Sequence, residues 1–532
     1  MPEISDARDS GLVRTAARGA LWTVLTSSTA RVVGLTGTLL LTRFLGPEEY
    51  GEVSLAAIVM MSANTFSNCG LSQYLVSKPN AGRAAAFHAT FYFTLLGLVA
   101  IAGALFLGGP LGTFIQAPGI GRFLPGLALA AVLERVGTIQ DRIQVRDMRF
   151  TSVGLLRSLG ELVYSGVSVG LAAYGSGCWW GGGNAVVLAS VARSVVRLVA
   201  LSATTPRREW LEPCRITWRQ TRELFAFGLP MSVATLAGFG SRKWDNLVFA
   251  HHFGQAAAGV YNLAYNLADI PATQLGETIG DVLVPSFAKL DTDDRRRRAL
   301  MLSMRQMTLL VAPLAFGLGA VAPTLGRIVG GRWAAIDLSL IILSVLSVVR
   351  PISWIASSYL QVKNLPHIIM VLETAKTAAL VLLMHLFAAY APRLAFLGRF
   401  GTRECWACAA VGLVFALNSL SYMLVFKKKT DRLPLSAQLA ELGPPVLACV
   451  PMVAAVVALR RLLPAASPWL ELPAEVAVGA AVFVPSAFLI APAATRELVG
   501  LLRSALARRR TFVGGSAPAT LVVAAEQERR DD

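Results

Sequence analysis

Apolar blocks of about twenty residues recur along almost the whole chain and constrain its fold more than any other feature. A helix of that length crosses the roughly 30 Å of hydrocarbon in a bilayer. Hydrophobic residues make up 55% of the 532 residues and charged residues 15%, which excludes a water-soluble multidomain chain. We therefore predict an all-α integral membrane protein with about 14 transmembrane helices, at 19–44, 50–77, 84–108, 120–141, 153–175, 182–204, 224–252, 258–284, 301–327, 334–360, 366–390, 404–426, 442–463 and 473–495.

The predicted spans group into two lobes and a helix pair. We expect a cytoplasmic N-terminus at 1–18, an N-lobe of helices 1–6 at 19–204, a cytoplasmic linker at 205–223 and a C-lobe of helices 7–12 at 224–426. Helices 13 and 14 follow at 442–495. Residues 504–532 carry many charges and few large apolar side chains, so we expect a disordered cytoplasmic tail.

Basic residues gather in short connections between the apolar blocks. With the N-terminus inside, Arg207–Arg208, Arg295–Arg298 and Lys427–Lys429 all fall in cytoplasmic loops, as the positive-inside rule requires. The formal net charge of +17 therefore indicates membrane topology and contact with anionic headgroups, and we expect no nucleic-acid partner. An even number of spans places both termini in the cytoplasm.

A short segment after the first span recurs later in the chain. Residues 44–56 and 252–264 share the pattern G-x4-G-x4-A, which begins at Gly46 in one copy and at Gly254 in the other, an offset of 254 − 46 = 208 residues. Six spans separate the copies, and because six is even, the two halves have the same orientation. This predicts a parallel repeat with a pseudo-two-fold axis along the membrane normal. The alternative is that glycine-rich turns recur by chance.

Four arginines are the predicted substrate-binding residues. A charge at a helix centre costs about 2.5–3.5 kcal/mol on insertion, so it persists where it faces a cavity or a partner. Arg31 and Arg242 fall near the midplane of helices one and seven, which are equivalent members of the two halves. Arg193 is also near mid-span, with Arg197 one turn away on the same face. Helices one and six contain no acid, so their arginines suit an anionic substrate group.

Three acids are the predicted ion-coupling residues. Asp245 shares a face of helix seven with Arg242, and Asp269 and Glu277 lie on a stripe of helix eight that also holds Thr273 and Asp281. A desolvated carboxylate can carry a proton or bind Na⁺, as a coupled transporter requires. The alternative is that these acids pair across helices with bases, for which the candidates are Arg242, Arg305 and Arg350.

Several motifs resemble a known family. The segment Ala20-Leu21-Trp22 with Thr42–Gly51, which reads TRFLGPEEYG, resembles the N-terminal signature of polysaccharide repeat-unit flippases of the multidrug/oligosaccharidyl-lipid/polysaccharide exporter superfamily. The second-half pattern of that family is similar to four further segments, Gly259–Ala264, Ile270-Pro271, Val284–Leu290 and Gly330–Trp333. The resemblance covers roughly residues 17–430. The C-terminal helix pair is more like the peptidoglycan lipid flippase branch.

The resemblance implies a flippase that moves undecaprenyl-pyrophosphate-linked oligosaccharide repeat units across the bacterial inner membrane by alternating access. It implies export for O-antigen or exopolysaccharide biosynthesis, with Arg31 as a substrate-contacting base. We expect a monomer that is not an enzyme and has no cofactor beyond H⁺ or Na⁺. The expected partners are the lipid-linked oligosaccharide, membrane lipids, a polysaccharide polymerase and a chain-length regulator.

Two other functions remain open. A cation-coupled multidrug antiporter of the same superfamily would prefer an acidic, aromatic cavity. A membrane glycosyltransferase or polymerase would need an acidic motif, and Asp291-Thr292-Asp293 is a DxD match that lies in a highly charged loop. Cys405 and Cys408 form a lone CxxC without a second half, so no metal site is expected.

Overall fold

The computed structural model describes residues 33–34, 36–69, 71, 82–146, 149–175, 177–206, 214–288, 290, 292–333, 335–363, 365–392, 399–430, 432–462 and 467–500. Within these ranges the chain is helical and contains no strand. It divides into two compact units, one of residues Thr15–Asn262, here called the N-unit, and one whose described part begins at Leu263, here called the C-unit.

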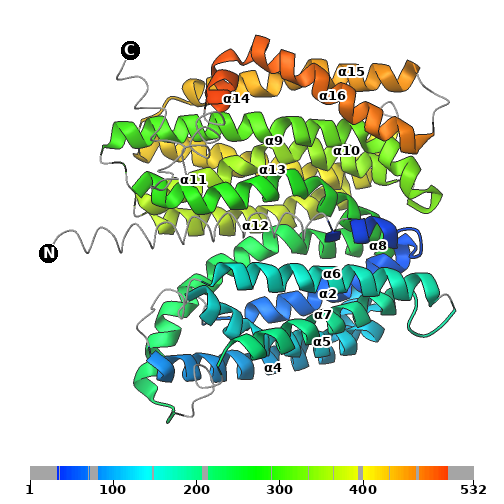
Figure 1. Ribbon diagram of the computed structural model, residues 1–532, viewed down its shortest axis with the longest axis vertical. Coiled ribbons are helices and arrows are strands. Elements are labelled where there is room, and N and C mark those ends of the chain that lie inside the picture. The colour runs from blue at the N-terminus through cyan, green and yellow to red at the C-terminus, as the bar shows by residue number, and fades with distance from the viewer. Residues whose placement is uncertain are drawn as a thin grey trace, which may run out of the picture. The chain divides into compact units, whose positions relative to one another are not determined.

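Helices α5 and α7 of the N-unit pack side by side (Figure 1). Local signals explain where these helices begin. Pro47 occupies the first turn of α2, where its missing N–H costs nothing, and Gly182 precedes α7 with a φ of 56°. Leu71, Phe93, Ile143 and Leu224 are buried together in one apolar cluster. The helices are α2 (Pro47–Phe66), α4 (Gly82–Phe114), α5 (Ile120–Arg146), α6 (Phe150–Tyr174) and α7 (Gly183–Thr204).

Helix α8 (Trp218–Ala288) is two helices joined by a kink at Gly254, whose φ of 80° and ψ of 174° are not helical. A side chain other than glycine is strained at this φ, so the glycine sets the position of the kink. The kink separates the predicted spans 224–252 and 258–284. The change from the N-unit to the C-unit comes eight residues beyond it, between Asn262 and Leu263.

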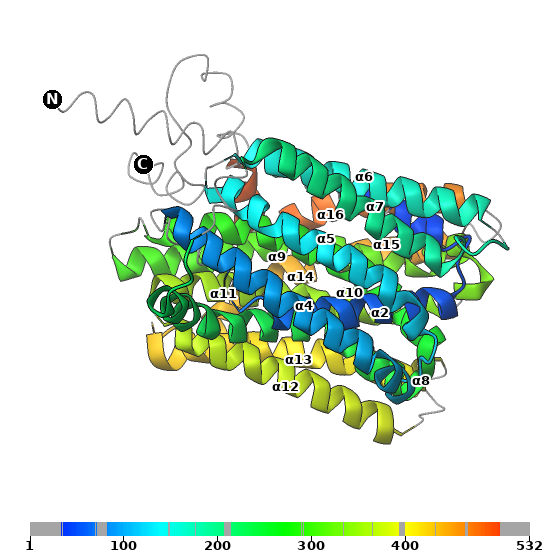
Figure 2. The same cartoon turned by 90° about the horizontal axis from the view of Figure 1, so that it is seen from below.

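The C-unit is built around α9, along which the C-terminal helices lie, while α12 and α13 run side by side (Figures 1 and 2). Thr292 caps α9, its hydroxyl accepting a bond from the Arg295 N–H, and Thr402 caps α13 in the same way through Cys405. Phe287, Tyr359 and Phe426 are central in its apolar core. The helices are α9 (Asp293–Val329), α10 (Ile336–Leu346), α11 (Arg350–Val362), α12 (Pro366–Tyr390), α13 (Arg403–Val425), α14 (Leu435–Leu447), α15 (Cys449–Leu462) and α16 (Pro468–Ile490).

Nine helical segments of the described chain are long and apolar enough to cross a membrane, which together with the helical architecture confirms the predicted class. Two of them combine shorter helices, since α10 continues into α11 over Ile336–Val362 and α14 into α15 over Leu435–Leu462. The helices α2, α6 and α8 are not among the nine. The count of fourteen spans and the division into lobes at 205–223 stay predictions.

Charged and polar sites in the membrane-spanning helices

The two predicted arginines of α7 face acids from neighbouring helices. The Arg193 Nη1 lies 3.3 Å from the Glu161 Oε1 of α6, and its guanidinium lies 5.0 Å from the Tyr164 ring centre. The Arg197 guanidinium lies 3.5 Å from Glu134 and 3.8 Å from Asp141, both of α5. Both arginines therefore belong to a mixed-charge cluster between α5, α6 and α7, although α7 itself carries no acid.

The other two predicted arginines are Arg31 and Arg242. Arg31 lies outside the described residues. Arg242 lies on the first arm of α8 with an exposed side chain, whose Nε donates to the Gly238 carbonyl at 3.2 Å, one turn back. Among the predicted acids, Glu277 is within α8, and its side chain lies outside the described part of the structure.

Asp245 is fully buried in the N-unit and accepts hydrogen bonds from three donors. The Asn246 amide N–H and side-chain Nδ2 both donate to one carboxylate oxygen at 2.9 Å, and the Tyr261 hydroxyl donates to the other at 2.6 Å. Asn262 donates to Asn246 at 2.8 Å, and Tyr261 stacks on Phe249 with ring centres 4.4 Å apart. These bonds join the two arms of α8 across the Gly254 kink. Hydrogen bonds donated to a buried carboxylate replace the water that would otherwise solvate its charge.

Asp269 forms an ion pair with Arg350 at the start of α11. This is one of the cross-helix pairs foreseen as the alternative to ion coupling, and it lies within the C-unit. The Arg350 guanidinium also lies over two rings, 4.8 Å from the centre of Tyr265 and 4.3 Å from that of Phe415. Phe415 has a second cation beside it, because the Lys376 Nζ lies 5.4 Å from the same ring centre. One aromatic ring therefore connects two ion pairs.

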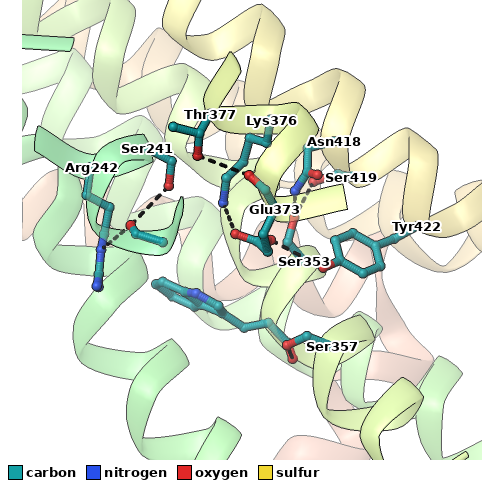
Figure 3. A network of polar contacts seen from close by, with 12 residues as sticks. Ser241, Arg242, Ser353, Ser357, Glu373, Lys376, Thr377, Asn418, Ser419 and Tyr422 are labelled. Carbon is teal, nitrogen blue, oxygen red and sulfur yellow. Dashed lines mark hydrogen bonds and ion pairs between the residues drawn. The ribbon is translucent and has the colours of Figure 1, made fainter. Parts of the chain in front are cut away.

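Lys376 pairs with Glu373 three residues earlier on α12, as their spacing indicates (Figure 3). The Tyr422 hydroxyl donates to the same carboxylate at 3.2 Å, and the side chains of both helices point toward this group. Next to it, the Asn418 amide donates to Ser353 at 3.1 Å. The C-unit thus has a continuous polar network inside an apolar helix bundle. Tyr422 and Asn418 were not predicted as site residues, since neither carries charge.

The glutamates of the GPEEYGE segment each bind a different helix of the N-unit. Glu48 accepts a bond from the Gln255 amide at 2.7 Å, and Glu49 accepts one at 2.7 Å from the N–H of Gly183 at the start of α7. An acid at a helix N-terminus satisfies an unpaired N–H and opposes the helix dipole. Glu52 forms an ion pair with Arg122 of α5. This segment is therefore a structural junction.

The two copies of the glycine repeat contact one another. A Cβ on Gly51 would overlap the Gln255 carbonyl and lie 3.1 Å from the Gly259 nitrogen. A Cβ on Gly259 would overlap the Pro47 carbonyl and lie 3.0 Å from the Gly51 nitrogen. Residues 47 and 255, like 51 and 259, are equivalent under the offset of 208, so the contact is reciprocal. Chance recurrence of glycine-rich turns does not explain this symmetry.

Arg135 of α5 is a buried charge that was not among the predicted site residues. Its side chain is only 1% exposed and is surrounded by neutral acceptors of α2 and α4. The guanidinium donates to the Phe93 carbonyl at 3.1 Å and to the Ser67 hydroxyl at 2.8 Å, and lies 4.1 Å from the Phe93 ring centre. Carbonyl, hydroxyl and amide oxygens thus replace water around this cation.

Ion pairs connect the C-terminal helices to both ends of α9. At one end, Arg305 bonds Glu441 and Glu497. At the other, buried Glu471 pairs with Arg327, while Arg460 lies 2.7 Å from the fully buried Glu475. Met452, Val456 and small residues of α9 form the seam between these clusters. The helix pair therefore packs on the C-unit as a part of it.

Cys405 and Cys408 are buried free thiols. Their sulfur atoms lie near the Arg399 carbonyl at 3.5 Å and the Ser339 hydroxyl at 3.8 Å. No group of three or more His, Cys, Asp or Glu side chains within the described ranges has the geometry to hold a metal ion.

A family model described as "Polysaccharide biosynthesis protein" matches residues 40–338, more than half of the chain. The chain belongs to this family. The match includes the GPEEYGE junction, the α7 arginines and the whole of α8. It therefore covers both copies of the glycine repeat.

Curated relatives of the chain have names from polysaccharide synthesis. The succinoglycan biosynthesis transport protein ExoT of Rhizobium meliloti (strain 1021) is 27% identical over 324 residues, which cover 60% of this chain and 64% of the relative. The lipopolysaccharide biosynthesis protein WzxC of Escherichia coli (strain K12) is 22% identical over 65% of this chain and 69% of its own length. The chain thus matches just under two thirds of the length of the first of these relatives.

Solved transporters share the fold. The lipid II flippase MurJ in an inward closed conformation aligns with a TM-score of 0.68 and 12% identity, covering 90% of this chain and 100% of MurJ. An inward-facing multidrug resistance transporter of the MATE family aligns with a TM-score of 0.53 and 15% identity, covering 78% and 96% of the two chains. Similarity at this identity supports the fold alone.

Proposed function

We propose that the protein is a flippase for undecaprenyl-pyrophosphate-linked oligosaccharide repeat units, which it moves from the inner to the outer leaflet of the bacterial inner membrane by alternating access. The observation that carries the proposal is the family match over residues 40–338, combined with relatives whose names place them in polysaccharide transport and biosynthesis. A fold shared with a lipid flippase over the whole length of that protein is consistent with it. We propose that both termini are cytoplasmic and that the protein acts as a monomer near a polymerase and a chain-length regulator.

In this proposal the arginines bind the pyrophosphate. Arg193 and Arg197 are in loose contact with carboxylates, at 3.3–3.8 Å, and both are partly exposed. A pyrophosphate with two or more negative charges can compete for such guanidinium groups, since it offers several charge-assisted hydrogen bonds. Arg31 and Arg242 complete the proposed set.

The proposed ion-coupling residues are Asp245, Asp269 and Glu277. Asp245 is supported by its full burial in an apolar helix bundle, since a buried carboxylate inside the membrane is of the kind that binds a proton or a small cation. For Asp269, coupling requires protonation to release Arg350, whose guanidinium is then available to another anion. Measuring transport in proteoliposomes against imposed H⁺ and Na⁺ gradients, with wild type and Asp245→Asn, tests this assignment. If transport by the variant depends on the ion gradients as transport by wild type does, Asp245 is not an ion-coupling residue.

The proposed function is tested by complementation of a bacterium that lacks its polysaccharide repeat-unit flippase. Wild type should restore surface polymer, and Arg193→Ala and Arg197→Ala should lower it at least about tenfold, the effect of losing one charge-assisted contact of about 1.5–3 kcal/mol. Arg403→Ala is the control, because that arginine is exposed in the first turn of α13 and lies outside the cluster of α5, α6 and α7. Equal polymer from all variants at matched membrane levels would argue against the cationic site.

A cation-coupled multidrug antiporter is the second candidate, favoured by the MATE-family neighbour. It predicts drug resistance in the same complemented cells without restored polymer.

A further inference from the structure

We propose that the loop between α6 and α7 is a carbohydrate-binding platform that contacts the sugar of the lipid-linked substrate. The platform consists of Tyr174, Trp179 and Trp180, and we call it the aromatic loop. This inference rests on the proposed function, since it assigns a surface to one part of that substrate. In the proposed topology the loop is on the outer face, where the sugar is delivered.

The aromatic rings of this loop are exposed. Trp179 is 72% exposed and Tyr174 is 90% exposed, while Trp180 packs edge-on against Trp179 with ring centres 5.8 Å apart. Aromatic rings as exposed as these mark a binding site or a membrane interface, because they leave a large apolar surface uncovered by the protein. The planes of the two indole rings are nearly perpendicular.

The loop is held in place by its own backbone and by the GPEEYGE junction. The Cys178 N–H donates to the Gly175 carbonyl at 2.9 Å, and the Asn184 amide donates to the Trp179 carbonyl at 2.7 Å. A Cβ on Gly175 would lie 2.8 Å from the Gly181 Cα and 2.9 Å from Trp180, so this turn closes tightly only with glycine. The Glu49 carboxylate fixes its other end at Gly183. The rings are therefore presented in a defined position, which lowers the entropy lost on binding.

The chemistry of the loop fits a neutral sugar. No acidic or basic residue occurs between Tyr174 and Asn184, so the loop lacks the groups that recognise phosphate or anionic headgroups. A pyranose has one face of C–H groups and a rim of hydroxyls. Flat rings with an N–H or O–H at the edge complement both features. The arginines of α7 are suited to the pyrophosphate, and this loop to the other end of the same molecule.

Insertion into the bilayer as an interfacial anchor is the competing role, since Trp and Tyr gather at membrane interfaces. The helix α6 has 25 residues, which rise about 37 Å against about 30 Å of hydrocarbon. Tyr174 ends this helix, and the tryptophans lie beyond it. Trp469, at the start of α16 and 59% exposed, is a tryptophan of similar exposure that is not in such a loop, and it serves as the matched control.

Two variants separate sugar binding from membrane anchoring. W179L/W180L keeps the apolar character that an anchor needs but removes the flat rings, whereas W179Y/W180Y keeps rings that can stack. We expect export of polymer in the complemented strain to fall about tenfold in W179L/W180L at limiting substrate, a change typical of losing one stacked ring, and to stay near wild type in W179Y/W180Y and in Trp469→Leu.

A second measurement locates the loop without transport. The tryptophan fluorescence of wild type is compared with that of W179F/W180F, in nanodiscs of brominated and of unbrominated phospholipid. The emission lost on the substitution should be the same in both lipids. Quenching by the brominated lipid, or full export by W179L/W180L, would overturn the platform while the proposed function stands. If wild type restores no polymer, the proposed function fails and the sugar assignment with it.

Discussion

Buried charges at the residue scale are satisfied in two different ways in this protein. Arg135 is surrounded by carbonyl, hydroxyl and amide oxygens, whereas Arg350 faces the carboxylate of Asp269 and two aromatic rings. The first arrangement joins α5 to α4 and to the end of α2, so it fixes the packing of these helices. The second balances the charge of the arginine with an acid of another helix. Buried arginines of similar exposure therefore have different partners.

Gly97 should be essential for the Arg135 site. A Cβ at this position would overlap the Arg135 guanidinium, which has no free space to move into because it is hydrogen-bonded and buried. We expect Gly97→Ala to destabilise the protein by about 2–4 kcal/mol, since displaced charge would lose its acceptors. Thermal unfolding in detergent measures this. Gly103→Ala, in the same helix with open space around it, is the control and should be neutral or stabilising.

Tyr261→Phe should weaken the Asp245 cluster. The substitution removes one hydroxyl that donates to a fully buried carboxylate at 2.6 Å, and hydrogen bonds to charged groups contribute about 1.5–3 kcal/mol. The Phe side chain keeps the stacking on Phe249. In the Asp245→Asn background the same change should cost less, and a double-mutant cycle by thermal unfolding measures the difference. Additive effects would show that the hydroxyl does not stabilise the carboxylate.

At the scale of helices, the lengths of the apolar blocks located most elements closely. The predicted span 366–390 coincides with α12, and 182–204 differs from α7 by one residue. Pro366 opens α12 and the glycines before α7 end the preceding turn, so local chemistry set both boundaries. The gap predicted between 252 and 258 is the Gly254 kink of a longer α8. The sequence shows the glycine, but it does not show whether the chain there forms a loop or a kinked helix.

The candidate sites were less predictable than the helices. The acids nearest to Arg193 and Arg197 come from α5 and α6, between about 30 and 60 residues away in the chain. Spacing within one helix, which accounts for the Glu373–Lys376 pair, carries no information about such contacts. Neutral members such as Tyr261 and Asn418 give no signal in a search for charges. Only the packing of the helices shows that Tyr261 lies beside a carboxylate and Asn418 beside a serine.

The crossing of α2 and α8 should tolerate no side chain at either glycine. We expect Gly51→Ala and Gly259→Ala each to destabilise the protein by about 1–3 kcal/mol, since each methyl would overlap a backbone carbonyl and push the helices apart. Because both changes act on one contact, the double variant should cost clearly less than the sum. Gly46→Ala, at an ordinary φ of −77° in open space, is the control. Additive costs measured by thermal unfolding would mean that the two glycines act separately.

At the scale of the whole molecule, the charge of the proposed substrate couples export to the membrane potential. Each negative charge moved outward from a negative interior gains about 2.3 kcal/mol per 100 mV. We expect export in proteoliposomes to rise with an inside-negative potential set by valinomycin and K⁺, and to fall when its sign is reversed. Wild type should be compared with liposomes lacking protein. Export rates that do not change with the membrane potential would indicate that another ion moves with the substrate and cancels its charge.

The reciprocal contact of Gly51 and Gly259 also bears on how such a chain could arise. A surface that fits its own equivalent is the kind through which two identical subunits form a closed dimer about a two-fold axis. A half-length ancestor with one glycine of this type would have built both sides of the crossing from a single gene. After a duplication and fusion of that gene, the other residues of the two halves would be free to diverge. At the axis itself each glycine remained the surface against which the other packs.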